Sequence, residues 1–132
     1  MSLLLSAILC LCFFSPTASA EDNPKSFTIN ASGDTAALAA VTGKTYLITG
    51  IAIQSTYEST AVVAVYVKSG DRNVIGSSTA RIPIDKTGID GYAGFVWQQN
   101  LDGWASGKLS EAITINCSAA QPIIVNISYR LR

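Results

Sequence analysis

Few residues in this chain have side chains that could carry out chemistry. The chain contains no histidine, which excludes the usual general base, the Ser-His and Cys-His nucleophile pairs and the common zinc sites. Cys117 is the single cysteine after residue 20, so a Cys-x-x-Cys redox pair and a thiolate metal cluster are also excluded. Carboxylates remain, but nearly all of them fall at turns or outside the strand patterns. We therefore predict no glycosidase-type pair and no enzyme.

One segment has some of the residues of a cation-binding turn. Asp85 and Asp90 flank the glycine-bearing stretch Thr87-Gly88-Ile89, and two carboxylates could share a calcium ion with backbone carbonyls. However, Lys86 lies between them, and the spacing is far from that of an EF-hand loop. We expect an ordinary polar turn here, and we predict no metal and no cofactor.

A tryptophan in an amide-rich stretch is the candidate binding residue. Trp104 follows Gln99, Asn100 and Asp102, in what should be a loop between two strands. Its indole could stack on a sugar or anchor a protein interface, because it offers a large apolar area and one polar group. The alternative is a tryptophan that folds back over the end of the domain. Tyr57, between two other strands, is a second candidate contact.

Apolar residues at every second position indicate β-strands over most of the chain. The clearest patterns are Ile123–Leu131 and Lys108–Cys117, each with one apolar and one polar face. Ala61–Lys68 is apolar on both faces, which predicts a central strand covered on both sides. Lys44–Gln54 is another long strand, in which Gly50 predicts a bulge or bend. Shorter candidates are Ser26–Asn30, Thr35–Val41, Asn73–Ser77, Ala80–Ile84 and Gly94–Gln98.

Turn residues separate these strands at short intervals, and no window has a helical apolar stripe. Several of the turns carry a glycine that can adopt a positive φ, among them Ser32-Gly33-Asp34, Thr42-Gly43 and Ser69-Gly70-Asp71. Eight or nine short strands with such turns predict an all-β fold, an antiparallel β-sandwich, and more specifically a jelly roll.

Cys117 lies within the apolar alternation of the strand predicted over Lys108–Cys117. Leu109, Ile113 and Ile115 precede it on the same predicted face. We therefore expect a thiol buried in the core. Pairing with another chain, or a reactive thiol, is the alternative.

The first residues of the chain resemble a secretion signal. Leu3 to Phe14 is apolar apart from Ser6, and it is followed by the small-x-small pattern Ala18-Ser19-Ala20. The apolar run is too short to cross about 30 Å of hydrocarbon as a helix. We expect residues 1–20 to be a signal peptide, with a retained apolar segment as the alternative, and residues 21–132 to be one β-sandwich domain.

The charges of the chain are sparse and balanced. It has 9 basic and 9 acidic residues, and its formal net charge is +0. This balance provides no basic surface for nucleic acid or for an anionic membrane, so no nucleic-acid partner is predicted. Because a net charge near zero weakens repulsion between copies, ordered self-association is tolerated.

The order of strands and turns resembles that of a known group of proteins. The pattern runs from the strand Gly43-Lys44-Thr45-Tyr46-Leu47 through Val62–Val67 and Trp104–Leu109 to Ile124–Tyr129. It is similar to the small jelly-roll proteins of tailed-phage virions that serve as decoration, spike or fibre-tip subunits. The resemblance implies a structural subunit, often trimeric, without catalysis. A cleavable signal departs from this group, because phage virion proteins assemble in the cytoplasm.

These observations predict a non-enzymatic structural protein. We expect a β-sandwich subunit that self-associates, for example as a trimer, on a virion surface or in an extracellular assembly, with other virion or surface proteins as further partners. A cleaved signal favours export, and a retained one favours the virion. The alternative is a secreted glycan-binding or adhesin-like module that uses Trp104.

Overall fold

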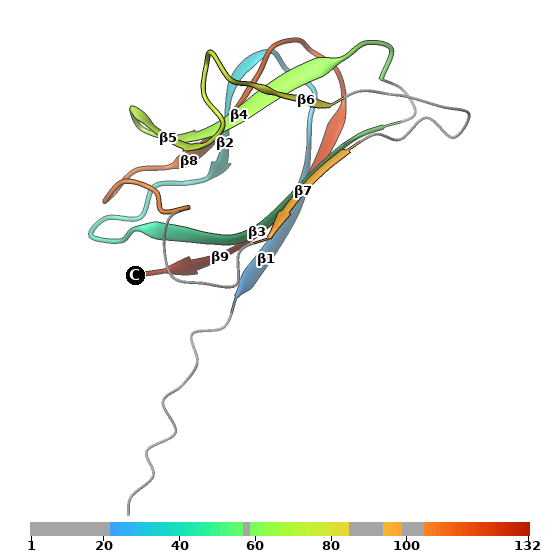
Figure 1. Ribbon diagram of the computed structural model, residues 1–132. Helices are drawn as coiled ribbons and strands as arrows, with labels where there is room; N and C mark the ends of the chain where they lie inside the picture. The colour runs from blue at the N-terminus through green and yellow to red at the C-terminus, as the bar shows by residue number, and fades with distance from the viewer. Residues whose placement is uncertain (1–21, 57–58, 85–93, 99–104) are drawn as a thin grey trace, which may run out of the picture.

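The computed structural model describes residues 22–56, 59–84, 94–98 and 105–132. In these ranges the chain forms nine strands and no helix, and the strands build two antiparallel sheets that lie as two layers (Figure 1). The antiparallel β-sandwich is therefore confirmed. The strands are β1 (Asn23–Ile29), β2 (Gly33–Leu38), β3 (Tyr46–Ser55), β4 (Val63–Ser69), β5 (Arg72–Ile75), β6 (Ile82–Ile84), β7 (Gly94–Gln98), β8 (Ile113–Cys117) and β9 (Ile123–Leu131).

One layer is the β9 sheet, with the strand order β1-β9-β3-β7. The other layer is the β8 sheet, with the order β2-β8-β4-β5, in which β6 also pairs with β4. Val65 pairs with both Cys117 of β8 and Ile82 of β6, while Val67 pairs with both Ile115 of β8 and Ile75 of β5. Strands β5 and β6 therefore share the edge of β4 that lies opposite β8.

The space between the sheets is filled by β-branched side chains from alternate positions. Ile123, Val125 and Ile127 of β9 face Ile113 and Ile115 of β8, and all five are almost completely shielded from solvent. Burial of each such side chain stabilises the fold by about 1.5–3 kcal/mol. The alternation also fixes which side chains of each strand point outward.

The structure confirms two local predictions. The register of β3 against β9 shifts between Ile48 and Gly50, so the bulge predicted at this glycine is present. Cys117 is buried at 2% exposure, and burial raises the pKa of its thiol to about 11. The thiol therefore stays protonated at neutral pH, as expected for a core cysteine.

The prediction of a strand over the whole of Lys108–Cys117 is wrong in its first half. Strand β8 begins only at Ile113, and Leu109 is 62% exposed rather than buried. The reason is a turn in which Ser110 adopts a φ of 60° and its amide donates to the carbonyl of Lys44 at 2.8 Å. This turn replaces a strand that the apolar alternation alone would allow.

The prediction for Ala61–Lys68 is confirmed in position, since β4 is an interior strand of its sheet. The strand is not buried on both faces as predicted, because Ala64 and Lys68 are partly exposed on the outer face. Tyr66 is buried on that face, and the Arg81 guanidinium lies 5.0 Å from its ring centroid. The outer face of β4 is thus shielded in part by a side chain rather than by another layer.

Two substitutions test the corrected burial pattern. Ile115→Ala should lower the free energy of unfolding by about 2–5 kcal/mol, because it opens a cavity between the sheets. Leu109→Ala should change it by less than about 0.5 kcal/mol, because the side chain is largely in solvent. Urea denaturation followed by circular dichroism measures both, and comparable losses for the two variants would contradict the corrected pattern.

Candidate functional site

The binding residues predicted from the sequence all lie outside the described residues. These are Tyr57, Gln99, Asn100, Asp102 and Trp104. The glycan-binding alternative that rests on them therefore stays a prediction. The polar turn expected around Asp85 and Asp90 also lies outside the described ranges.

The described residues that precede the predicted contacts in the chain lie at different positions along β3. Gln98, before the Trp104 segment, pairs with Gly50, whereas Ser55 ends the strand before Tyr57. Gly50 and Ser55 are separated by about 17 Å at the rise of a β-strand. The described chain thus gives no support for combining the two predicted contacts into one small site.

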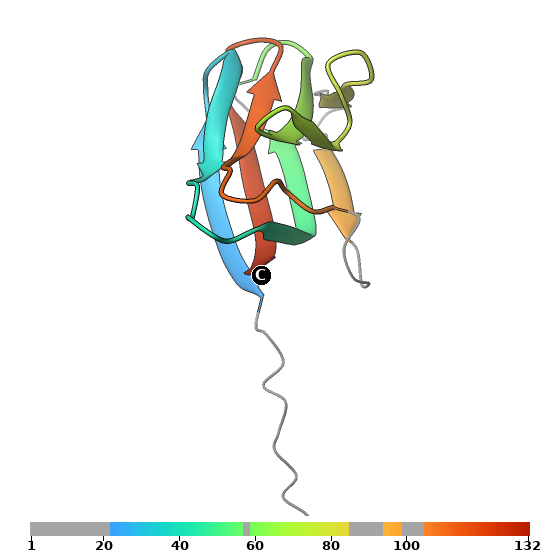
Figure 2. The same ribbon diagram turned by 90° about the vertical axis from the view of Figure 1, so that its left-hand side faces the viewer.

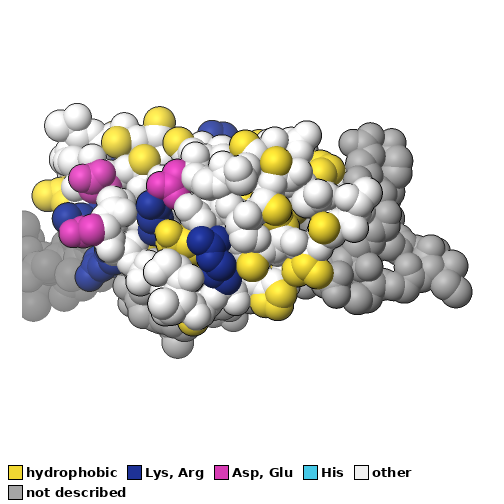
Figure 3. Space-filling model, turned by 90° about the horizontal axis from the view of Figure 1, so that it is seen from above, with side chains coloured by type: hydrophobic (Ala, Val, Ile, Leu, Met, Phe, Trp, Pro, Cys, Tyr) yellow, Lys and Arg dark blue, Asp and Glu magenta, His cyan; other side chains and the backbone are white. Residues whose placement is uncertain are grey.

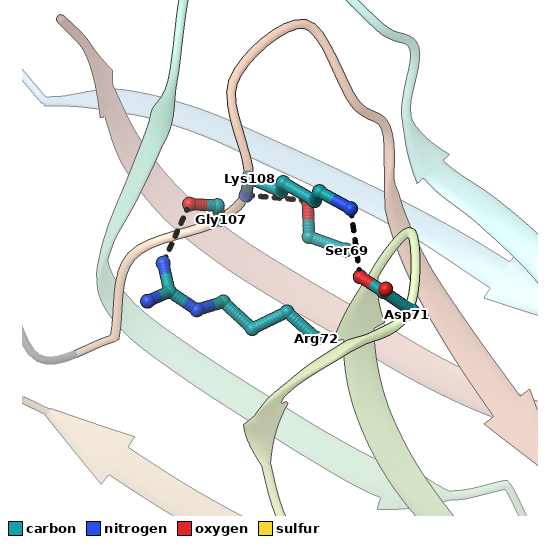
Figure 4. Close-up of polar contacts among 5 residues, drawn as sticks. All are labelled: Ser69, Asp71, Arg72, Gly107 and Lys108. Carbon is teal, nitrogen blue, oxygen red and sulfur yellow. Dashed lines mark hydrogen bonds and ion pairs between the residues drawn. The ribbon is translucent and has the colours of Figure 1, made fainter.

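Described polar groups converge where the β4–β5 turn meets the segment after residue 104 (Figure 4). The buried hydroxyl of Ser69 accepts a hydrogen bond from the Lys108 amide at 2.9 Å. The Lys108 ammonium pairs with Asp71 at 2.9 Å, and the Arg72 guanidinium donates to the Gly107 carbonyl at 3.3 Å. We call Ser69, Asp71, Arg72, Gly107 and Lys108 the end clamp.

The end clamp attaches one segment to both sheets. On the β9 sheet, the Gly107 amide donates to the Tyr46 carbonyl at 2.7 Å, and Ile48 donates to Ala105 at 3.0 Å. A Cβ on Gly107 would lie 3.0 Å from both the Ser69 hydroxyl and the Ile113 side chain, so a larger residue would require these side chains to shift. These contacts join the two sheets at one end of the sandwich.

A second polar cluster lies on the outer face of the β8 sheet. The Lys68 ammonium is 2.6 Å from the Asp34 carboxylate, and the Asn116 amide donates to the same carboxylate at 2.5 Å. The hydrogen bond from Asn116 and then that from Lys68 hold the pKa of Asp34 below its usual value. The Asp34 hydrogen bond in turn raises the pKa of Lys68, so the amine stays protonated and is no nucleophile. The cluster therefore joins β2, β8 and β4 rather than reacting.

The outer face of the β9 sheet differs from both clusters, because its side chains are uncharged and most of them are small or polar, with Ile124 as the large apolar member. The register places Ser26 and Ala52 on either side of Asn126, and Thr28 and Gln54 on either side of Ile124. We call this surface, completed by Pro24 and Ser128, the neutral face. Ser26, Thr28, Gln54 and Asn126 are exposed.

Charge is almost absent from the strands that carry the neutral face. Strands β3 and β7 contain no charged residue, β1 contains only Lys25 and β9 only Arg130. Lys25 pairs in register with Ile127 and so points to the inner side, where its ammonium donates to the Ala37 carbonyl at 2.8 Å. Arg130 is paired with Asp22 at 2.5 Å. The middle of the neutral face therefore carries no charge among the described residues.

Two further chemical features are absent from the described ranges. No three Cys, Asp or Glu side chains there lie close enough to hold a metal ion together. No helix there is both long and apolar enough to cross a bilayer.

Comparison with known proteins identifies no relative: no protein-family model matches the chain, and a search of curated proteins finds no match.

The end clamp leads to a stability prediction. Ser69→Ala should lower the free energy of unfolding by about 1–2 kcal/mol, because the Lys108 amide loses its hydrogen-bond acceptor at a buried position. Ser78→Ala, at an exposed position between β5 and β6, is the control and should change stability by less than about 0.5 kcal/mol. Equal urea midpoints for Ser69→Ala and the wild type would show that the clamp does not stabilise the fold.

Proposed function

We propose that this protein is a non-enzymatic structural subunit that self-associates on the surface of a virion or in an extracellular assembly. The observation that carries the proposal is the neutral face, a broad antiparallel sheet surface without charge at its centre. Soluble monomers ordinarily cover such surfaces with mixed charges that keep copies apart. A sheet face without them lets copies approach closely.

The strand order supports the finer interpretation as a jelly roll. If β5 and β6 are counted as one position, because they share one edge of β4, the two sheets have four positions each. Strands from the first half of the chain then alternate with strands from the second half, as in β1-β9-β3-β7 and β2-β8-β4. Jelly rolls are built from two four-stranded sheets of this interleaved kind and often serve in capsids.

The sheet edges on one side of the sandwich favour association through faces rather than through added strands. Strands β1 and β2 lie on the same side of the sandwich, each at the edge of its own sheet, and the outer edge of each strand is unpaired in its sheet (Figure 2). Pro24 provides no amide hydrogen, Lys25 points a charge inward, and the register of β2 shifts between Ala36 and Leu38. Inward charges, prolines and bulges are the features that prevent open-ended strand pairing. Closed oligomers are compatible with such edges.

The N-terminus decides between the two proposed settings. Removal of residues 1–20 would favour an extracellular assembly, and their retention would favour a virion. Intact mass measurement of the protein from its native source distinguishes a chain that starts at Glu21 from one that starts at Met1.

Self-association itself is tested by size-exclusion chromatography with multi-angle light scattering. At micromolar concentration, a chain of residues 21–132 should elute with a mass that is a whole multiple of the monomer mass. The mass should not fall when the salt concentration is raised, because few charges would take part in the contact. A strictly monomeric particle over this concentration range would contradict the proposal.

A further inference from the structure

We infer that copies of this chain meet through the neutral face, each copy packing its β9 sheet against the β9 sheet of a second copy. The inference rests on the proposed function and adds the surface and the partner. The partner that binds the neutral face is a second copy of this chain.

The size of the face is at the lower limit for a specific contact. Four strands spaced about 4.8 Å apart span about 19 Å, and strands of five to ten residues average about 26 Å in length. The flat area of the whole β9 sheet is therefore roughly 500 Å² in each copy and roughly 1,000 Å² in a pair, which is about the smallest area that a specific protein interface buries. Side-chain relief adds to this area.

The chemistry of the face fits a second copy better than a charged partner. In a two-fold contact the same patch occurs on both sides, so a charge near the centre would meet its own like charge. The central positions hold Asn126, Ser26 and Ala52, none of which carries a charge. Amides and hydroxyls both donate and accept hydrogen bonds, so each can pair with the same group of another copy.

The outer face of the β8 sheet lacks this self-complementarity. This outer face carries Asp34 and Lys68, and Arg81 lies over Tyr66 just before β6. Figure 3 shows this face, with positive and negative side chains gathered toward its β5 end. Stacking this face on a copy of itself would bury such charges, which costs free energy wherever they meet no opposite partner. The β9 sheet is therefore the favoured surface.

A matched pair of substitutions tests the location. Asn126→Arg places a charge at the centre of the neutral face, and Asn73→Arg makes the same change at an exposed, outward position of β5 in the β8 sheet. Light scattering over a concentration series gives the dissociation constant of each oligomer. Asn126→Arg should raise this constant at least about 100-fold, because like charges are buried together, and Asn73→Arg should leave it within about threefold.

The outcomes separate this inference from the proposed function. Unchanged association in both variants, equal weakening in both, or weakening in Asn73→Arg alone would each overturn the neutral-face contact and leave self-association in place. A monomeric wild type would overturn both and leave the face to a partner other than a second copy. If Asn126→Arg does not fold by circular dichroism, Ser26→Arg replaces it, since Ser26 is exposed and pairs with Asn126.

Discussion

The constraint on which the rest of this structure depends is the burial of every second residue between two sheets. Ile113 and Ile115 of one sheet and Val125 and Ile127 of the other leave almost no surface to solvent. Because the period of a strand is two, this burial determines the direction of every residue in between. The outward positions of β9 thereby fall on Ile124, Asn126 and Ser128, and the composition of the outer surface follows from the packing of the inner one.

Polar side chains complete the fold where alternation stops. The end clamp connects the β4–β5 turn to the segment that begins at Ala105, and the Asp34 cluster joins three strands of the β8 sheet. Both clusters use their charged groups within the molecule. The β9 sheet has little comparable charge, and this difference between the two outer surfaces is the basis of the proposed contact between copies.

The sequence predicted the sandwich well because alternation is local: β7 has the predicted bounds, Gly94–Gln98, and the bulge at Gly50 is present. It failed at Leu109, where an apolar residue continues the pattern but two long-range hydrogen bonds form a turn. The Ser110 amide donates to the Lys44 carbonyl, and the Ser110 hydroxyl accepts from the Gly43 amide. The sequence predicted the low charge that tolerates self-association, but not the extent of the neutral face, which depends on which strands become neighbours. The Trp104 segment lies outside the described residues and cannot be compared.

The central claim is that copies meet through the outer surface of the β9 sheet, and a spin label tests it most directly. A nitroxide is attached to the Ser128→Cys variant, which is prepared without ¹⁵N and mixed with ¹⁵N-labelled wild type. Only amides of the wild-type chain are then observed, so any broadening comes from a nitroxide on a neighbouring copy. The account predicts selective broadening of the amides of Ser26, Ala52 and Asn126, with those of β4 and β5 unaffected. Broadening confined to β4 and β5, or none at concentrations where the protein is oligomeric, would contradict it.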